Sequence, residues 1–217
     1  MLTFDISTSL DGFVAGVGPT LESPLGNGGE QLHEWVFGLA AWRKPHGLDG
    51  GEQGPDNDIV AEQLASTGAA IMGRRMFSGG QGPWEDDPNA AGWWGDSPPF
   101  GYPVFVLTQH AREAETYANG TSFTFVTEGI EPALEQARAA AGDRDVSIAG
   151  GASVVQQYLR AGLVDEFQVH VAPVLLGDGV HLFGRLGLGP RDVEIARVVS
   201  SPSVTHLRYR VTRPPAA

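Results

Sequence analysis

The sequence predicts an α/β fold, with a mixed, mostly parallel central sheet, flanking helices and an antiparallel strand pair near the C-terminus. Between residues 2 and 159, short runs of β-branched and aromatic residues alternate with amphipathic helical patterns. Two strand patterns, 193–199 and 204–211, then follow each other with only a turn between them. Strands that alternate with helices favour parallel pairing, whereas consecutive strands favour antiparallel pairing, so both kinds are expected in one sheet.

Length and composition fit this fold. The chain has 217 residues, of which 41% are hydrophobic, and this is enough for the core of one domain. We expect that domain to span residues 1–213, with a glycine-rich insertion at about 17–55 and a disordered tail at 214–217. The net charge of −12 disfavours nucleic acid as a partner, because a phosphate backbone requires a basic surface.

Several other classes of site are disfavoured. Cysteine is absent, which excludes disulfides and thiolate metal sites. No apolar run approaches the roughly 20 residues of a membrane span, so we expect a soluble, cytoplasmic protein with no membrane partner. The histidines show no metal-ligand spacing, and no metal site is predicted. His170 lies in a strand pattern, which indicates a core or interface residue.

The first part of the chain begins with a strand. Residues 2–7 alternate apolar and polar side chains, and an Asp-Gly turn at 11–12 continues the strand into a short extended piece. In the insertion, apolar residues at helical spacing predict a helix over about 29–42, which either packs on the core or forms a lid over a ligand. A helix of about ten residues begins at Asp56, and a buried strand follows at 69–73.

The second part contains a long loop and further strands. Residues 78–103 are rich in glycine and proline but contain three tryptophans, which would not be left in water, so the loop is predicted to be ordered. Strands are expected at 104–107, 123–126 and 146–149, and a crossover helix at 130–141. A long strand is predicted over 164–176, before the antiparallel pair.

The turn at Gly150 and Gly151 joins a buried strand to a helix. Glycines let the backbone approach a ligand closely, and the N-terminus of a helix attracts phosphate, although an empty turn would have the same sequence. Two more strand ends carry groups suited to phosphate, at 73–75 and 107–110. Ligands of parallel sheets bind at the carboxyl ends of the strands, so the three together predict one binding site.

Five segments carry a family resemblance: residues 9–15 (SLDGFVA), 71–77 (IMGRRMF), 104–108 (VFVLT), 148–154 (IAGGASV) and 164–179. In order and spacing they resemble the dihydrofolate reductase superfamily. The closer likeness is to the C-terminal reductase domain of the bacterial riboflavin-biosynthesis protein RibD. The resemblance covers nearly the whole chain outside the insertion and parts of the tryptophan loop. It implies a dihydrofolate-reductase-like single domain and a reductase that takes hydride from NADPH.

The resemblance also implies the residues of the cofactor site. Those expected at the cofactor phosphates are Gly73, Arg74, Arg75 and Met76. Those expected around the adenosine and its 2′-phosphate are Leu107, Thr108 and Gln109 or His110. Those expected to hold the pyrophosphate are Gly150, Gly151, Ala152 and Val154, and those expected to line the nicotinamide are Ser7, Ala15 and Ala149. An arginine fork suits phosphate, but surface salt bridges in this acidic chain are the alternative for Arg74 and Arg75.

Reduction of a pterin-like ring needs a proton beside the hydride, and a buried carboxyl with a raised pKa is the usual source. In dihydrofolate reductases an acidic residue on the helix before the Met-Gly-Arg strand holds the pterin, and Asp58 falls at about that place. Glu62, one turn later, is the alternative, and a helix cap is the competing interpretation of Asp58. The chain lacks the Trp-Pro pair of folate reductases and has Val155 where a tyrosine usually flanks the nicotinamide, which disfavours folate itself.

The expected function is that of an NADPH-dependent oxidoreductase. It would transfer hydride to a small heterocyclic substrate, pterin- or pyrimidine-like, or to a carbonyl or quinone-like one. The first alternative is the pyrimidine reductase of riboflavin-type biosynthesis. The second, from another class, is a catalytically silent NADP-binding sensor or interaction protein. The apolar strand at 167–176 and the tryptophan-bearing insertion predict a homodimer.

Overall fold

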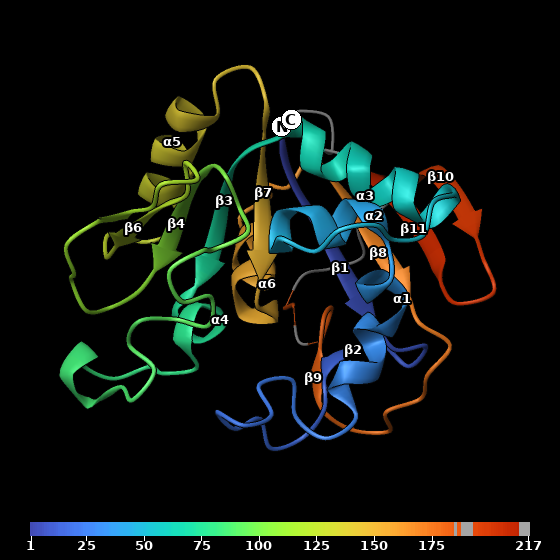
Figure 1. Ribbon diagram of the computed structural model, residues 1–217, viewed down its shortest axis with the longest axis horizontal. Coiled ribbons are helices and arrows are strands. Elements are labelled where there is room, and N and C mark those ends of the chain that lie inside the picture. Colours follow the sequence, from blue (N-terminus) through green and yellow to red (C-terminus); the bar gives the residue numbers. More distant parts are fainter. Residues whose placement is uncertain (185, 188–192, 213–217) are drawn as a thin grey trace.

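The described part of the chain folds around a nine-stranded sheet, seen face-on in Figure 1. The computed structural model describes residues 1–184, 186–187 and 193–212. Within these residues the strand order is β10-β11-β8-β1-β7-β3-β4-β6-β5. A separate two-stranded ribbon pairs β2 (Phe13–Ala15) with β9 (Val180–His181) beyond the end of β1.

The six central strands are parallel to one another. They are β8 (Glu166–Val171), β1 (Leu2–Thr8), β7 (Asp145–Gly150), β3 (Thr67–Gly73), β4 (Pro103–Leu107) and β6 (Ser122–Val126). Antiparallel strands complete the sheet on both sides. On one side β11 (Thr205–Val211) pairs with β8, and β10 (Val193–Ser200) pairs with β11. On the other side the short β5 (Glu115–Thr116) pairs with β6. The predicted mixed, mostly parallel sheet with a C-terminal antiparallel pair is confirmed.

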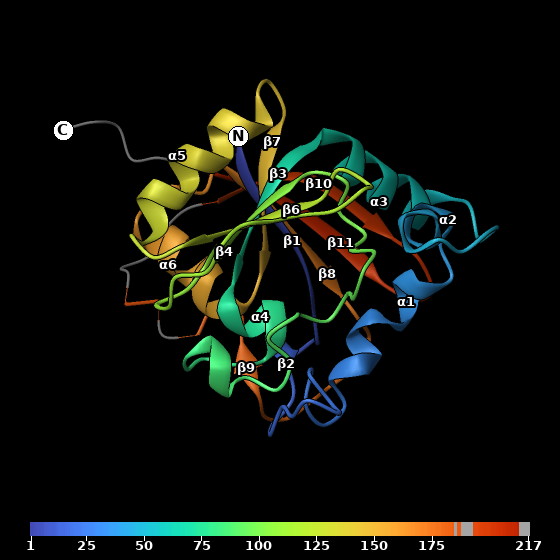
Figure 2. The ribbon, with the colours of Figure 1, turned by 60° about the vertical axis from the view of Figure 1, so that its left-hand side comes forward.

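Helices cover both faces of the sheet (Figure 2). On one face, α5 (Ile130–Ala141) and α6 (Ala152–Arg160) pack on a core that includes Leu2 and Phe4 of β1. Because side chains alternate along a strand, Thr3 and Asp5 point to the opposite face, where α3 (Pro55–Ser66) lies. The apolar–polar alternation of the first strand therefore separates an apolar layer from a polar one.

The tryptophan loop forms a second core on the α3 side of β3, β4 and β6. Phe77 of α4 (Arg74–Ser78) is fully buried there with Phe123, and Trp84 and Trp94 pack against them. Trp84 begins the short helix η3 (Trp84–Asp86). The prediction of an ordered loop at 78–103 is confirmed, because its indoles cover an aromatic cluster that would otherwise face water.

The predicted helix at 29–42 is wrong as a single element. The segment contains η1 (Gly29–His33), α1 (Glu34–Phe37) and α2 (Ala40–Arg43), followed by η2 (Lys44–His46). Leu39 interrupts it because its backbone is extended, with ψ at 138°, and bridges to Glu52. The apolar spacing remains useful, since Leu32, Val36 and Leu39 are all buried.

The predicted strand at 164–176 is also too long. Strand β8 ends at Val171, because Pro173 has no N–H to continue the ladder. The chain then turns back, and the N–H groups of Leu176 and Gly177 bind the carboxylate of Asp11. The predicted tail at 214–217 lies outside the described residues. Among those described, no helix is long and apolar enough to cross a membrane.

Candidate cofactor site at the carboxyl edge of the sheet

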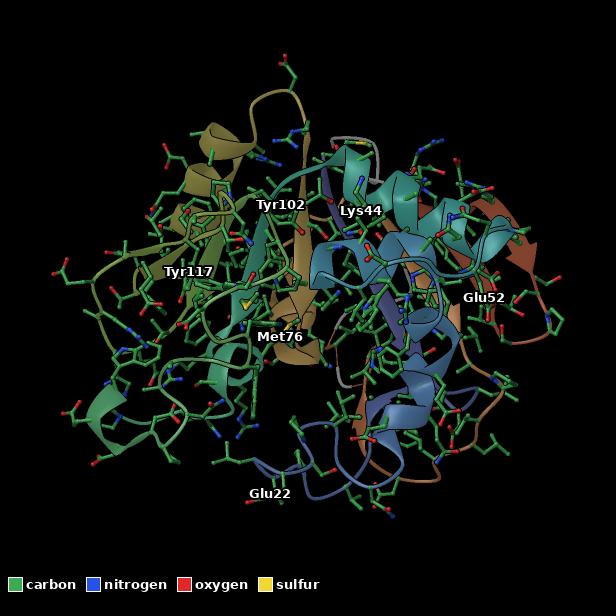
Figure 3. All side chains as sticks on the ribbon, viewed as in Figure 1. Glu22, Lys44, Glu52, Met76, Tyr102 and Tyr117 are labelled. Atoms are coloured by element: carbon green, nitrogen blue, oxygen red, sulfur yellow. The ribbon has the colours of Figure 1, made fainter. Side chains whose placement is uncertain are left out.

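The turns after β3 and β7 meet at the carboxyl edge of the sheet. A Cβ placed on Gly73 would lie 2.9 Å from Val154 Cγ2, and 4.0 Å from the backbone nitrogen of Gly151. A Cβ on Gly150 would lie 3.0 Å from Met76 Sδ, and Figure 3 shows Met76 between α4 and α6. Glycine at these two positions allows the two turns to approach each other, so five of the predicted phosphate-site residues do come together.

The backbone at the β7–α6 turn requires glycine for a second reason. Gly150 has a φ of 129°, which lies in the region open to glycine. Helix α6 begins directly afterwards, and no side chain caps its N-terminus. Val154, Val155 and Tyr158 anchor α6 in the core, and the Tyr158 hydroxyl donates to the carbonyl of Ile130 at 2.7 Å. The helix thus presents its N-terminal amide groups at the carboxyl edge of the sheet.

The predicted nicotinamide side lies at the end of β1. Ser7 is buried, and its hydroxyl oxygen accepts a hydrogen bond from Trp35 Nε1 at 3.0 Å. Ala149 of β7 lies on the same face of the sheet as Ser7, because it packs with the aromatic core rather than with α5 and α6. Ala15 lies in β2, which follows the end of β1. Ser7 and Ala149 thus lie on neighbouring strands and on the same face of the sheet, and Ala15 lies in the ribbon beyond the end of β1.

The predicted adenosine side follows β4. Leu107 ends the strand, and the Thr108 hydroxyl accepts a hydrogen bond from the N–H of His110 at 3.1 Å. The carbonyl of His110 in turn accepts from Trp84 Nε1 at 2.8 Å. This loop is therefore tied to the tryptophan loop, and His110 is half-buried beside it.

Comparisons with known proteins identify the family to which this chain belongs. The family model of the RibD C-terminal domain matches residues 1–207. The chain belongs to this family. The predicted likeness to the dihydrofolate reductase superfamily, through its RibD branch, is confirmed.

Solved structures share the fold, and a curated relative matches part of the sequence. A putative riboflavin biosynthesis protein from Shewanella sp. PV-4 is 21% identical and superimposes with a TM-score of 0.62 over 98% of this chain and 99% of its own. The Thermotoga maritima diaminohydroxyphosphoribosylaminopyrimidine deaminase/5-amino-6-(5-phosphoribosylamino)uracil reductase is 13% identical, with a TM-score of 0.54 over 98% of this chain and 56% of its own. The Bacillus subtilis protein YwjB is 36% identical over 63 residues, a segment that covers 29% of this chain and 36% of YwjB. The match thus spans about a third of that relative.

Arg74, which the family resemblance places at the cofactor phosphates, makes its contacts within the protein. It is 7% exposed, its guanidinium lies 2.5 Å from the Asp87 carboxylate, and it also donates to the Ser78 hydroxyl. The guanidinium stacks on the indole of Trp84 at 3.4 Å from the ring centroid. Arg74 is therefore a buried structural residue rather than a surface one, and its neighbour Arg75 is the exposed arginine after β3.

Neither predicted proton donor is a buried carboxyl. Asp58 is exposed on the first turn of α3. Glu62 is 49% exposed and accepts hydrogen bonds from Arg197 and Arg208 at 2.7 and 2.6 Å. Partial burial opposes the charge of Glu62, but these hydrogen bonds lower its pKa, so it is held as a carboxylate. The structure gives neither residue the environment of a proton source.

Sequence reasoning missed the polar groups that do lie beside Ser7. Asp5 precedes Ser7 by two residues and shares its face of β1, and His170 of β8 is the register partner of Ser7. The signal was the alternation of residues 2–7, which places polar side chains on a face that α3 covers. Among the described residues, no group of three or more His, Asp or Glu side chains is arranged to bind a metal ion.

Proposed function

We propose that this protein is an NADPH-dependent reductase that transfers hydride to a small heterocyclic substrate, pterin- or pyrimidine-like, or to a carbonyl or quinone-like one. The observation that carries the proposal is the contact between the β3–α4 and β7–α6 turns. Gly73, Gly150 and Met76 bring backbone and the uncapped start of α6 to one point of the sheet edge. Membership of the RibD C-terminal domain family supports a dinucleotide as the phosphate ligand.

The residues present fit this cofactor. The start of α6 would hold the pyrophosphate, and the exposed guanidinium of Arg75 would bind the 2′-phosphate in place of the buried Arg74. Ser7 and Ala149 would line the nicotinamide, and the indole of Trp35 offers an aromatic surface beside Ser7 for a substrate ring. When bound, the cofactor supplies the hydride.

Titration with NADPH and NADH tests the proposal, with tryptophan fluorescence as the signal. We expect NADPH to bind more tightly than NADH, and a panel of pterins, pyrimidines and quinones to contain an acceptor that oxidises it. No binding of either dinucleotide would refute the proposal. Tight NADPH binding without reduction of any panel member would favour the NADP-binding sensor instead.

The pyrimidine reductase of riboflavin biosynthesis is a second candidate, because the family and the Thermotoga relative both point to it. The substrate named for the Thermotoga relative carries a phosphorylated ribose, and its binding would require basic residues near the carboxyl edge of the sheet. The insertion offers Arg43, Lys44 and His46. Arg43 binds the carbonyl of Asp49, and His46 stacks on Trp42. Lys44 lies beside α3, well separated from Met76 in Figure 3. Reduction of the ribosylaminopyrimidine at a lower KM than its sugar-free analogue would support this candidate.

We also propose a homodimer, through a different surface from the predicted one. Of the predicted segment 167–176, residues 167–171 belong to β8 and are buried between β1 and β11. Strand β10, at the end of the described sheet, carries three exposed apolar residues: Val193 is 42% exposed, Ile195 68% and Val198 56%. Ile195→Lys should convert a dimer into a monomer in sedimentation experiments. A wild-type monomer would refute the proposal.

A further inference from the structure

A buried layer of polar side chains lies between the sheet and α3, next to Ser7. Because strands alternate, β1 contributes Asp5 and Ser7, β8 contributes Gln168 and His170, and β11 contributes His206 from the same face. His170 and His206 are 6% and 1% exposed. Figure 1 shows β1, β8 and β11 side by side beneath α3 and α1. Apart from Ser7, the proposed cofactor does not use these groups, so their burial requires another explanation.

The two histidines form a directed chain with an acid. His170 Nδ1 lies 2.7 Å from His206 Nδ1, and His206 Nε2 lies 3.1 Å from Asp56 Oδ1. If the Asp56 carboxylate accepts the Nε2 proton of His206, then His206 Nδ1 must accept from His170 Nδ1. His170 Nε2 is left with its lone pair, and it faces Asp5 Oδ1 at 3.7 Å.

Asp5 has the environment that was sought in Asp58. Burial raises the pKa of its carboxyl to about 7, although Arg208 and the hydrogen bond from Gln168 lower it; the charges of Glu62 and Glu166 raise it further. Gln168 Nε2 donates to Asp5 Oδ1 at 2.9 Å. Burial and repulsion from His206 and His33 lower the pKa of His170 to about 3, so His170 stays neutral and Asp5 is the group that holds a proton.

The side chain of Asp5 is 18% exposed, so water can reach it. A pocket of about 50 Å³ lies between α3 and the sheet, and Asp5, Gln63 and Arg208 are among the residues that line it. At about 10–15 Å³ for each water, this pocket holds a few water molecules. On the other side, the Trp35 ring lies 4.8 Å from the His170 ring and 5.1 Å from the His206 ring, and Trp35 Nε1 binds Ser7.

We propose that Asp5 holds the proton that the reduction consumes, and that His170, His206 and Asp56 are positioning residues that direct it. The inference rests on the proposed reductase function. Hydride passes from NADPH to the carbon of a C=N or C=O bond, and the π electrons of that bond move to the nitrogen or oxygen. That atom takes the proton of Asp5, which is left as a carboxylate. A solvent proton that passes through the water in the pocket restores the acid, so each turnover consumes one NADPH and one proton.

The full chain and its Asp5→Asn variant test the assignment, with Asp145→Asn as a matched control. Asp145 lines the same pocket but binds the amino terminus. With the first pterin, pyrimidine or quinone that the wild type reduces, kcat should fall above about pH 7 as Asp5 loses its proton. Asp5→Asn should be at least tenfold slower and insensitive to pH in that range, with unchanged NADPH affinity. The Asp145→Asn profile should match the wild type.

Two further measurements separate a proton role from a structural one. Infrared spectroscopy should show the C=O stretch of a protonated carboxylic acid at about pH 6 in the wild type and in Asp145→Asn, but not in Asp5→Asn. His206→Gln frees the tautomer of His170, so the midpoint of the kcat profile should move to lower pH. A wild-type pH profile in Asp5→Asn overturns the assignment of Asp5 alone. A wild type that reduces nothing overturns the proposed function and this inference together, and the infrared band then reports only a buried acid.

Discussion

Replacing Arg74 and Arg75 separately tests whether the structure has divided their roles correctly. Arg74→Ala leaves the Asp87 carboxylate, which is 2% exposed, without its cation. Breaking a buried ion pair by removing one partner costs about 3–5 kcal/mol. Asp87 keeps hydrogen bonds from the Ser78 hydroxyl and the Asn89 N–H, so we expect the lower end, about 3 kcal/mol. For a chain of this size that corresponds to a Tm lower by roughly 6–12 °C.

Arg75→Ala should behave in the opposite way. Its side chain is exposed, so Tm should change by no more than about 2 °C, as for most surface substitutions. Loss of a charge-assisted contact to the 2′-phosphate should cost about 1.5–3 kcal/mol of binding, which is roughly a ten- to hundredfold weaker Kd for NADPH. The Kd for NADH should not change.

Thermal unfolding followed by circular dichroism gives Tm, and fluorescence titration gives both Kd values. Asp87→Asn is the control, because it breaks the same pair from the other side and should lower Tm without changing the preference for NADPH. If Arg74→Ala kept its Tm and lost that preference, the buried role of Arg74 would be refuted, and the original phosphate assignment would stand.

Three other predictions follow from single contacts. Gly150→Ala should lower both Tm and NADPH affinity, because a φ of 129° strains a residue with a side chain and the added Cβ would lie 3.0 Å from Met76 Sδ. An unchanged Tm in thermal unfolding and an unchanged Kd in the NADPH titration would contradict this. Tyr158→Phe should lose a buried hydrogen bond worth about 1 kcal/mol, and Tm should fall by about 2–4 °C in thermal unfolding. Between about pH 4 and 6.5, the raised pKa of Asp5 makes stability fall as pH rises, whereas the lowered pKa of His170 makes it fall as pH drops. Asp5→Asn removes the first effect, so its free energy of unfolding, from urea titrations, should drop by about 1.4 kcal/mol per pH unit more steeply on acidification than that of the wild type.

The strand pattern and the glycine turns could be predicted because both are local. Apolar alternation places a strand, and a glycine directly after it indicates close approach of another backbone, as Gly73 and Gly150 show. The ends of helices and strands were harder to predict from the sequence. The interruption at Leu39 depends on a bridge to Glu52, which the spacing of apolar residues does not contain.

Side-chain directions at the site required the tertiary structure. The family pattern assigned Arg74 to phosphate, but its partner Asp87 lies in a loop without periodicity, and only folding brings the two together. The sequence did not point to Asp5 for a related reason. A polar residue in an alternating strand normally faces water, and only the packing of α3 over β1 makes this one a buried acid.

Two indoles, those of Trp35 and Trp84, donate hydrogen bonds at different parts of the carboxyl edge, so they can serve as separate fluorescent reporters. Trp35 donates to Ser7 on the proposed nicotinamide side, and Trp84 donates to the carbonyl of His110 on the proposed adenosine side. Their environments differ, because Trp84 stacks on the guanidinium of Arg74 and Trp35 lies against neutral imidazoles. Variants that keep only one of these fluorophores would therefore report separately on each half of a bound dinucleotide. A fragment such as adenosine 2′,5′-bisphosphate should quench the fluorescence of Trp84 and leave that of Trp35 unchanged.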